Sequence, residues 1–134
     1  MAFTVKSSVD ARVAHIEVLE DNSTTTVTFE PNGSSLADIN AWLKGFSWGA
    51  IRNFTVGVTG ISARTWTIDV YMADRVTKAF SVATLATDTA FSVGANGSID
   101  ASGNQYPRIH PGKIVVTLSA TGTGGTVTLQ VEKP

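Results

Sequence analysis

Histidine is the side chain that most readily acts as a base or a metal ligand near neutral pH, and the chain has two, His15 and His110. They stand far apart, and neither belongs to a His-X-His or His-Glu-X-X-His motif. The segment 100–104, Asp-Ala-Ser-Gly-Asn, resembles part of a calcium loop but lacks the glutamate that closes one. Cysteine is absent, which excludes thiolate zinc sites and thiol catalysis. We therefore predict no metal site and no cofactor.

The patterns of nucleophilic and acid–base catalysis are missing as well. There is no Gly-X-Ser-X-Gly elbow, and His110 has no acidic neighbour in the sequence that could orient its ring. Asp69 lies at an outward strand position beside aromatic residues, but a glycosidase needs two carboxylates across a cleft. The segment 121–125, Thr-Gly-Thr-Gly-Gly, lacks the Lys-Ser/Thr and the helix of a phosphate-binding loop, so we expect a flexible hairpin loop there. We predict no catalytic residues and no enzymatic activity.

Aromatic residues permit a different kind of chemistry, because their rings stack on sugars and anchor protein interfaces. Trp42 and Trp66 fall on apolar stripes that we assign to the core. Trp48 follows the expected helix in a Ser-Trp-Gly loop, Tyr71 points outward on a strand, and Tyr106 lies in an irregular segment. These three remain available for a partner, and the sequence favours neither a sugar nor a protein.

The irregular segment is 94–112, which breaks the regular alternation of the rest of the chain. Long loops in compact domains are usually functional or disordered, and tyrosine and arginine are frequent interface anchors. We interpret the segment as a contact arm; an ordinary crossover between two sheets is the alternative. The candidate interface residues are Trp48, Tyr71, Tyr106, Arg108, Ile109 and His110.

These residues must be positioned by strands, because alternation with a period of two dominates the sequence. One segment, 35–44, changes to helical spacing, with Ser34 or Ser35 as its cap and Lys44-Gly45 as its stop. We predict an all-β, jelly-roll-like two-sheet β-sandwich of eight or nine strands with one short helix, forming a single domain over residues 1–134. The expected strands cover residues 3–9, 12–20, 24–30, 51–58, 64–72, 76–83, 89–93, 114–118 and 126–132.

The surface of such a domain would be unusually neutral. Charged residues make up 16% of the chain, against roughly 25% in ordinary soluble domains, and the formal net charge is −1. Nucleic acids and anionic membranes attract basic proteins, so we expect neither as a partner. No secretion signal or membrane span is evident in the sequence. Interfaces are depleted in charge, so we expect an assembly; a neutral, threonine-rich monomer is the alternative.

The whole chain resembles a known family, from the Met-Ala-Phe-Thr-Val start, through SSLADINAWLKGF, to the TGTGGTVTLQVEKP end. It is similar to the small jelly-roll decoration proteins that cement the heads of tailed bacteriophages. The resemblance implies a structural protein of the virion, made in the host cytoplasm and bound to the capsid exterior. There it would hold neighbouring major capsid subunits together against DNA pressure. The implied partners are the major capsid protein and further copies of the chain, as a homodimer or alternatively a homotrimer. A carbohydrate- or receptor-binding β-sandwich is the alternative function.

Overall fold

The computed structural model describes residues 2–7, 13–30, 53–94, 97–99, 104–107, 109 and 111–132. The expected helix over 35–44 lies outside these residues, as do Trp48, Arg108 and His110. Within the described ranges, no helix is long and apolar enough to cross a membrane. Eleven strands are described there: β1 (Ala2–Ser7), β2 (Val13–Asp21), β3 (Thr26–Phe29), β4 (Asn53–Thr59), β5 (Thr65–Tyr71), β6 (Lys78–Ala86), β7 (Thr89–Val93), β8 (Ser98–Ile99), β9 (Gln105–Tyr106), β10 (Lys113–Leu118) and β11 (Thr123–Glu132).

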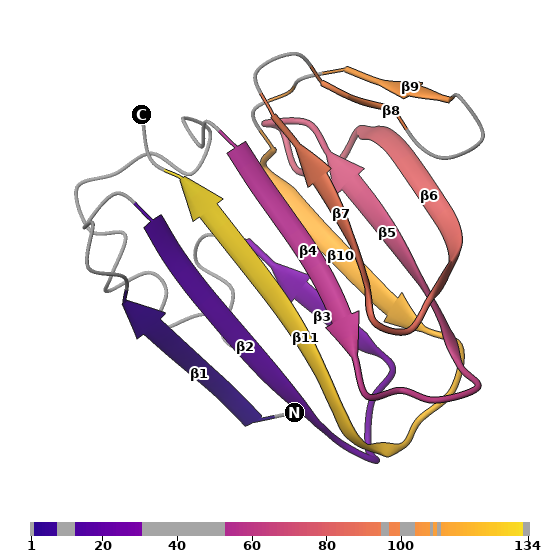
Figure 1. Ribbon diagram of the computed structural model, residues 1–134. Helices are drawn as coiled ribbons and strands as arrows, with labels where there is room; N and C mark the ends of the chain where they lie inside the picture. Colours follow the sequence, from indigo (N-terminus) through magenta and orange to yellow (C-terminus); the bar gives the residue numbers. More distant parts are fainter. Residues whose placement is uncertain are drawn as a thin grey trace.

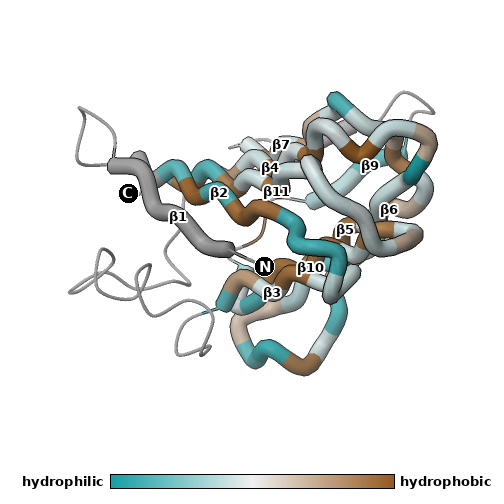
Figure 2. Tube along the Cα trace, turned by 90° about the horizontal axis from the view of Figure 1, so that it is seen from below, coloured by the Kyte–Doolittle hydropathy of each residue, from teal (hydrophilic) through white to brown (hydrophobic). Residues whose placement is uncertain are grey.

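The strands form two packed antiparallel sheets (Figures 1 and 2). Sheet A has the order β1-β2-β11-β4-β7, and sheet B has the order β3-β10-β5-β6. The pairs are nested along the chain: β2 pairs with β11, β3 with β10, β4 with β7, and β5 with β6. A long hairpin rolled onto itself gives this order, which is that of a jelly roll. The predicted all-β, jelly-roll-like two-sheet sandwich is confirmed, and the short helix that was part of this prediction lies outside the described residues.

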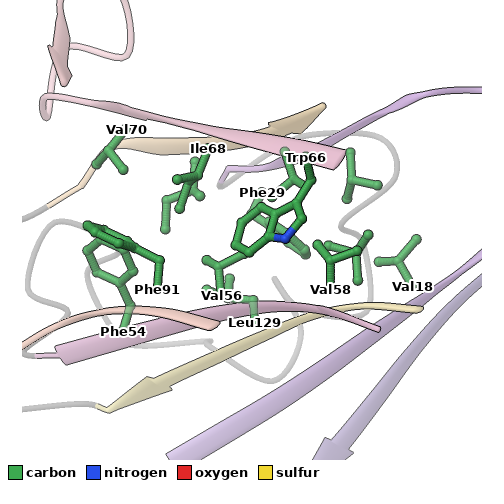
Figure 3. Close-up of a cluster of buried hydrophobic side chains, with 14 of the residues drawn as sticks. Val18, Phe29, Phe54, Val56, Val58, Trp66, Ile68, Val70, Phe91 and Leu129 are labelled. Atoms are coloured by element: carbon green, nitrogen blue, oxygen red, sulfur yellow. The ribbon is translucent and has the colours of Figure 1, made fainter. Parts of the chain in front are cut away.

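The alternation of side chains explains why these segments are strands. Along β5, every second residue is buried, beginning with Trp66, which is 1% exposed. The residues between them, such as Thr67 and Asp69, are half-buried on the outer face. The two inner faces meet in one apolar core, in which Trp66, Ile68 and Val70 of sheet B point toward the strands of sheet A (Figure 3). Burial of this apolar surface is the main term that stabilises the sandwich.

The structure differs from the expected strands in two places. The irregular segment 94–112 contains the two-residue strands β8 and β9, which pair with each other through Ser98–Tyr106 and Ile99–Gln105. Strands this short carry no alternation that the sequence could reveal. The expectation of a flexible hairpin loop over 121–125 is wrong, because β11 already begins at Thr123 and Gly125 is buried. The reason is a polar contact beneath these glycines, described below.

The connections between strands lie at two opposite ends of the sandwich (Figure 1). One end, here called the turn end, holds the short connections β2–β3, β4–β5, β6–β7 and β10–β11. The other, here called the loop end, holds the β5–β6 connection over residues 72–77 and the segment between β7 and β10. Of the described interface candidates, Tyr71 lies on an outer sheet face, and Tyr106 and Ile109 lie in the segment between β7 and β10.

Candidate functional site

Tyr106 is not a free anchor, because its ring packs against the body of the sandwich. Its centroid lies 5.0 Å from that of Phe80 on β6 and 5.3 Å from that of Phe91 on β7. Phe80 and Phe91 are themselves 5.9 Å apart in an edge-to-face arrangement. Such geometries are favourable for aromatic pairs. Since β6 and β7 are edge strands of opposite sheets, Tyr106 covers the side of the core between them.

Ile109, three residues after Tyr106, also packs against the core. It is half-buried, and Pro111 after it is buried. The segment that the sequence marked as a contact arm therefore folds back onto its own domain at the described positions Tyr106 and Ile109. Of the candidates in this segment, these two both pack against the core, and Arg108 and His110 lie outside the described residues.

Tyr71 lies on the outer face of sheet B, as expected, and it is half-buried. The Lys113 ammonium stands over its ring, 4.2 Å from the centroid, which is the geometry of a cation–π contact. On the neighbouring outward position of β5, Asp69 accepts a hydrogen bond from Ser81 Oγ and lies 3.4 Å from Lys78 Nζ. The ring and the carboxylate are both engaged within the chain, so this face does not offer the bare aromatic platform that sugars require.

The candidates for catalysis or metal binding are not brought together. His15 lies mid-strand on the outer face of sheet A, where its Nε2 is 3.5 Å from Glu17 Oε1. Asp69 is on the other sheet. Among the described residues, no group of three histidine or acidic side chains is placed to hold a metal ion.

The turn end contains a buried ion pair that sequence reasoning missed. Glu20, at the end of β2, has a side chain with no exposed surface, and Arg64 approaches it from the β4–β5 connection. Both guanidinium Nη atoms donate to the carboxylate, Nη1 to Oε2 at 2.8 Å and Nη2 to Oε1. A bidentate pair of this kind is directional as well as strong. These bonds lower the pKa of the Glu20 carboxyl below its usual value, although burial opposes the shift.

The same pair ties two connections to the strands beside them. Arg64 Nε donates to the Ile61 carbonyl at 3.0 Å, and its Nη1 also donates to the Ala120 carbonyl at 3.1 Å. Glu20 Oε1 accepts the Gly125 N–H at 2.9 Å. The end of β2, the β4–β5 connection, the β10–β11 connection and the start of β11 are thus joined through two side chains. The sequence does contain a signal for this pair. By alternation, Glu20 lies on the same buried face of β2 as Ile16 and Val18, and Arg64 lies on the same face as Trp66.

Two glycines of the 121–125 segment, Gly122 and Gly125, make room for this pair. A Cβ on Gly125 would stand 2.6 Å from Glu20 Oε1 and 2.7 Å from Ile61 Cγ2. A Cβ on Gly122 would stand 2.5 Å from the Arg64 Cζ. Real Cβ contacts are not this short, so a side chain at either position would displace the ion pair. Gly122 and Gly125 therefore serve packing, whereas Gly124, with nothing near its Cβ position, has a φ of 86° in the left-handed region that favours glycine.

The outer faces of the two sheets differ in charge. On sheet B, Thr26, Thr117 and Thr67 are register partners in one row across β3, β10 and β5. On sheet A, the corresponding outward positions of β2 and β11 include His15, Glu17 and Glu132. Threonine also occupies the outward positions 28 and 65 of sheet B, and the charged residues on this face are Lys113, Asp69 and Lys78.

Comparisons with protein-family models, with curated proteins and with solved structures found no match for this chain. The arguments about function therefore come from the chain itself.

Proposed function

We propose that the chain is a non-enzymatic structural protein that binds the exterior of a bacteriophage capsid and cements neighbouring major capsid subunits. The observation that carries this proposal is the outer face of sheet B. Its threonine row is neutral, and interface cores are depleted in lysine, glutamate and aspartate relative to other surfaces. The jelly-roll fold and the sequence resemblance to phage decoration proteins agree with it.

A cement protein acts mechanically. Packaged DNA pushes shell subunits apart, and a body that contacts two subunits at once opposes their separation with its binding free energy. A stable contact of this kind needs about 1,000 Å² or more of buried surface. The rigid sandwich suits the task, because an already ordered surface loses little conformational entropy on docking. Copies joined as a dimer or trimer gain further, since the second contact is made within one complex.

The carbohydrate-binding alternative has weaker support. Tyr71 is the described aromatic residue on an outer sheet face, and Lys113 already stands over its ring. Tyr106 is packed against Phe80 and Phe91. Neither ring offers a sugar an open stacking surface.

The proposal is tested by adding the purified protein to expanded heads of the encoding phage from which accessory proteins have been stripped. We expect the protein to co-sediment with these heads and to raise the temperature at which they release DNA. Unexpanded shells are the control, and a glycan array tests the alternative. If the protein neither binds the stripped heads nor changes their stability, the proposal is wrong.

A further inference from the structure

A small hollow lies on the outer face of sheet A near the loop end, where β4 begins and β11 ends (Figure 1). Its volume is about 180 Å³. The residues around it are Asn53, Phe54 and Thr55 of β4 and Gln130, Val131 and Glu132 of β11. Phe54 and Val131 are buried in the core, so the walls of the hollow are the polar side chains of the other four.

The first unusual feature of the hollow is a buried acceptor without a donor. Asn53 Nδ2 donates to Glu132 Oε2 at 2.7 Å, across the β4–β11 pair. Asn53 Oδ1 is buried and accepts no hydrogen bond. Turning the amide over would only move this deficit, because Oδ1 would then face the Glu132 carboxylate, and both groups are acceptors. In either orientation, the pair has one acceptor too many, and a buried acceptor left unpaired is unfavourable.

The second feature is a negative charge without a cation. Glu132 is half-buried, and its hydrogen bond comes from a neutral amide. The ion pairs of the described residues use other acids, which are Glu17, Glu20 and Asp69. No cation in this part of the chain therefore pairs with Glu132. Gln130 is exposed on the same face and adds an amide carbonyl that can accept. The hollow thus presents acceptors around one negative charge.

A ligand that fits the hollow must donate hydrogen bonds and carry a positive charge. A guanidinium group has several N–H donors in one plane, no acceptor and a permanent charge, and it pairs with carboxylates in a directional way. Calcium fits less well, because it takes about six to eight oxygen ligands, whereas the hollow has one carboxylate. The volume is well above the roughly 10–15 Å³ that a single water requires, so a small planar group has room.

We propose that the hollow binds a guanidinium group, either the end of an arginine side chain on a partner protein or a free guanidinium compound. The group donates to the Glu132 carboxylate, which then no longer depends on Asn53 Nδ2 as its donor. The Asn53 amide is thereby able to turn Oδ1 toward the ligand, which satisfies the unpaired acceptor. The site is on the opposite sheet from the threonine row, and it does not depend on the proposed capsid function.

The test follows NMR spectra of the ¹⁵N-labelled protein as it is titrated with N-acetylarginine amide. We expect saturable shifts centred on the backbone and side-chain amides of Asn53 and Gln130. N-acetylcitrulline amide is the matched control probe, because its head group has a similar shape but is neutral and carries an acceptor; it should cause no saturable shift. Methylguanidinium separates the two sources. Binding of both guanidinium probes supports a partner side chain, and binding of methylguanidinium alone supports a free compound.

A matched pair of variants tests the role of the charge. Glu132→Gln keeps an acceptor for Asn53 Nδ2 but removes the charge, and it should weaken methylguanidinium binding at least about tenfold. Glu17→Gln removes a carboxylate from the same sheet face outside the hollow and should leave binding unchanged. Thermal melts check that both variants fold.

Three results would overturn the proposal: no saturable shift with either guanidinium probe, equal binding of the citrulline probe, or unchanged binding in Glu132→Gln. Calcium is titrated separately as a competitor. If it displaces methylguanidinium and binds the same residues more tightly, the hollow is a metal site and the proposal is wrong.

Discussion

The two ends of the sandwich are built on opposite principles. At the turn end, short connections are tied to one another by the buried Glu20–Arg64 pair, and the charges of both residues are used inside the fold. At the loop end, the β5–β6 connection over residues 72–77 satisfies polar groups locally through Asp74 and leaves Met72 and Val76 exposed. One end therefore closes the core with buried charges, and the other leaves apolar side chains exposed.

The largest expected effect contrasts two aliphatic residues. Ile61 at the turn end is 1% exposed, and Ile61→Ala should lower the free energy of unfolding by about 2–5 kcal/mol through the lost contacts and the cavity left behind. Val76→Ala at the loop end should change it by less than about 0.5 kcal/mol. Urea unfolding of both variants measures the difference. Equal losses would contradict the division between the ends.

A smaller contrast uses two glycines. Gly125→Ala should destabilise the fold by about 1–3 kcal/mol, the usual range for overpacking, because its Cβ would meet Glu20 and Ile61. Gly94→Ala is the control, since its Cβ would meet only Asn53 Oδ1, at the ordinary contact distance of 3.9 Å. Thermal melts should show a lower midpoint for Gly125→Ala than for Gly94→Ala. If the two midpoints agree, the turn end is less tightly packed than its geometry implies.

The smallest expected effect is the response of the turn end to acid. The folded-state pKa of Glu20 lies below its ordinary value of 4.5. The ionised Glu20 carboxylate therefore stabilises the fold above about pH 4.5, and this stabilisation is lost as the pH falls through the folded-state pKa. Glu20→Gln removes the titrating group. The difference in urea midpoint between wild type and Glu20→Gln should therefore be largest near pH 7 and shrink below about pH 4.5. A difference that stays constant with pH would show that Glu20 acts through shape alone.

Much of the fold was predictable from the sequence because alternation reports directly which side of a strand is buried. The expected strands at 89–93 and 114–118 agree with β7 and β10 to within one residue. The assignment of Trp66 to the core is confirmed. The candidate interface is less predictable: the sequence leaves Tyr106 available for a partner, yet its ring packs on Phe80 and Phe91. An irregular segment has no repeating pattern of buried and exposed residues. Which of its side chains face the core therefore depends on contacts with strands that are distant in the sequence.

By itself, the sequence determined the all-β class, the inward and outward faces of most strands, and the low surface charge, since each follows from local alternation or composition. The tertiary structure decided the jelly-roll pairing, the joining of Glu20 to Arg64, and the cover that Tyr106 and Ile109 form over the core. These contacts link residues far apart in the chain, and local patterns carry no information about which distant partner a side chain will meet.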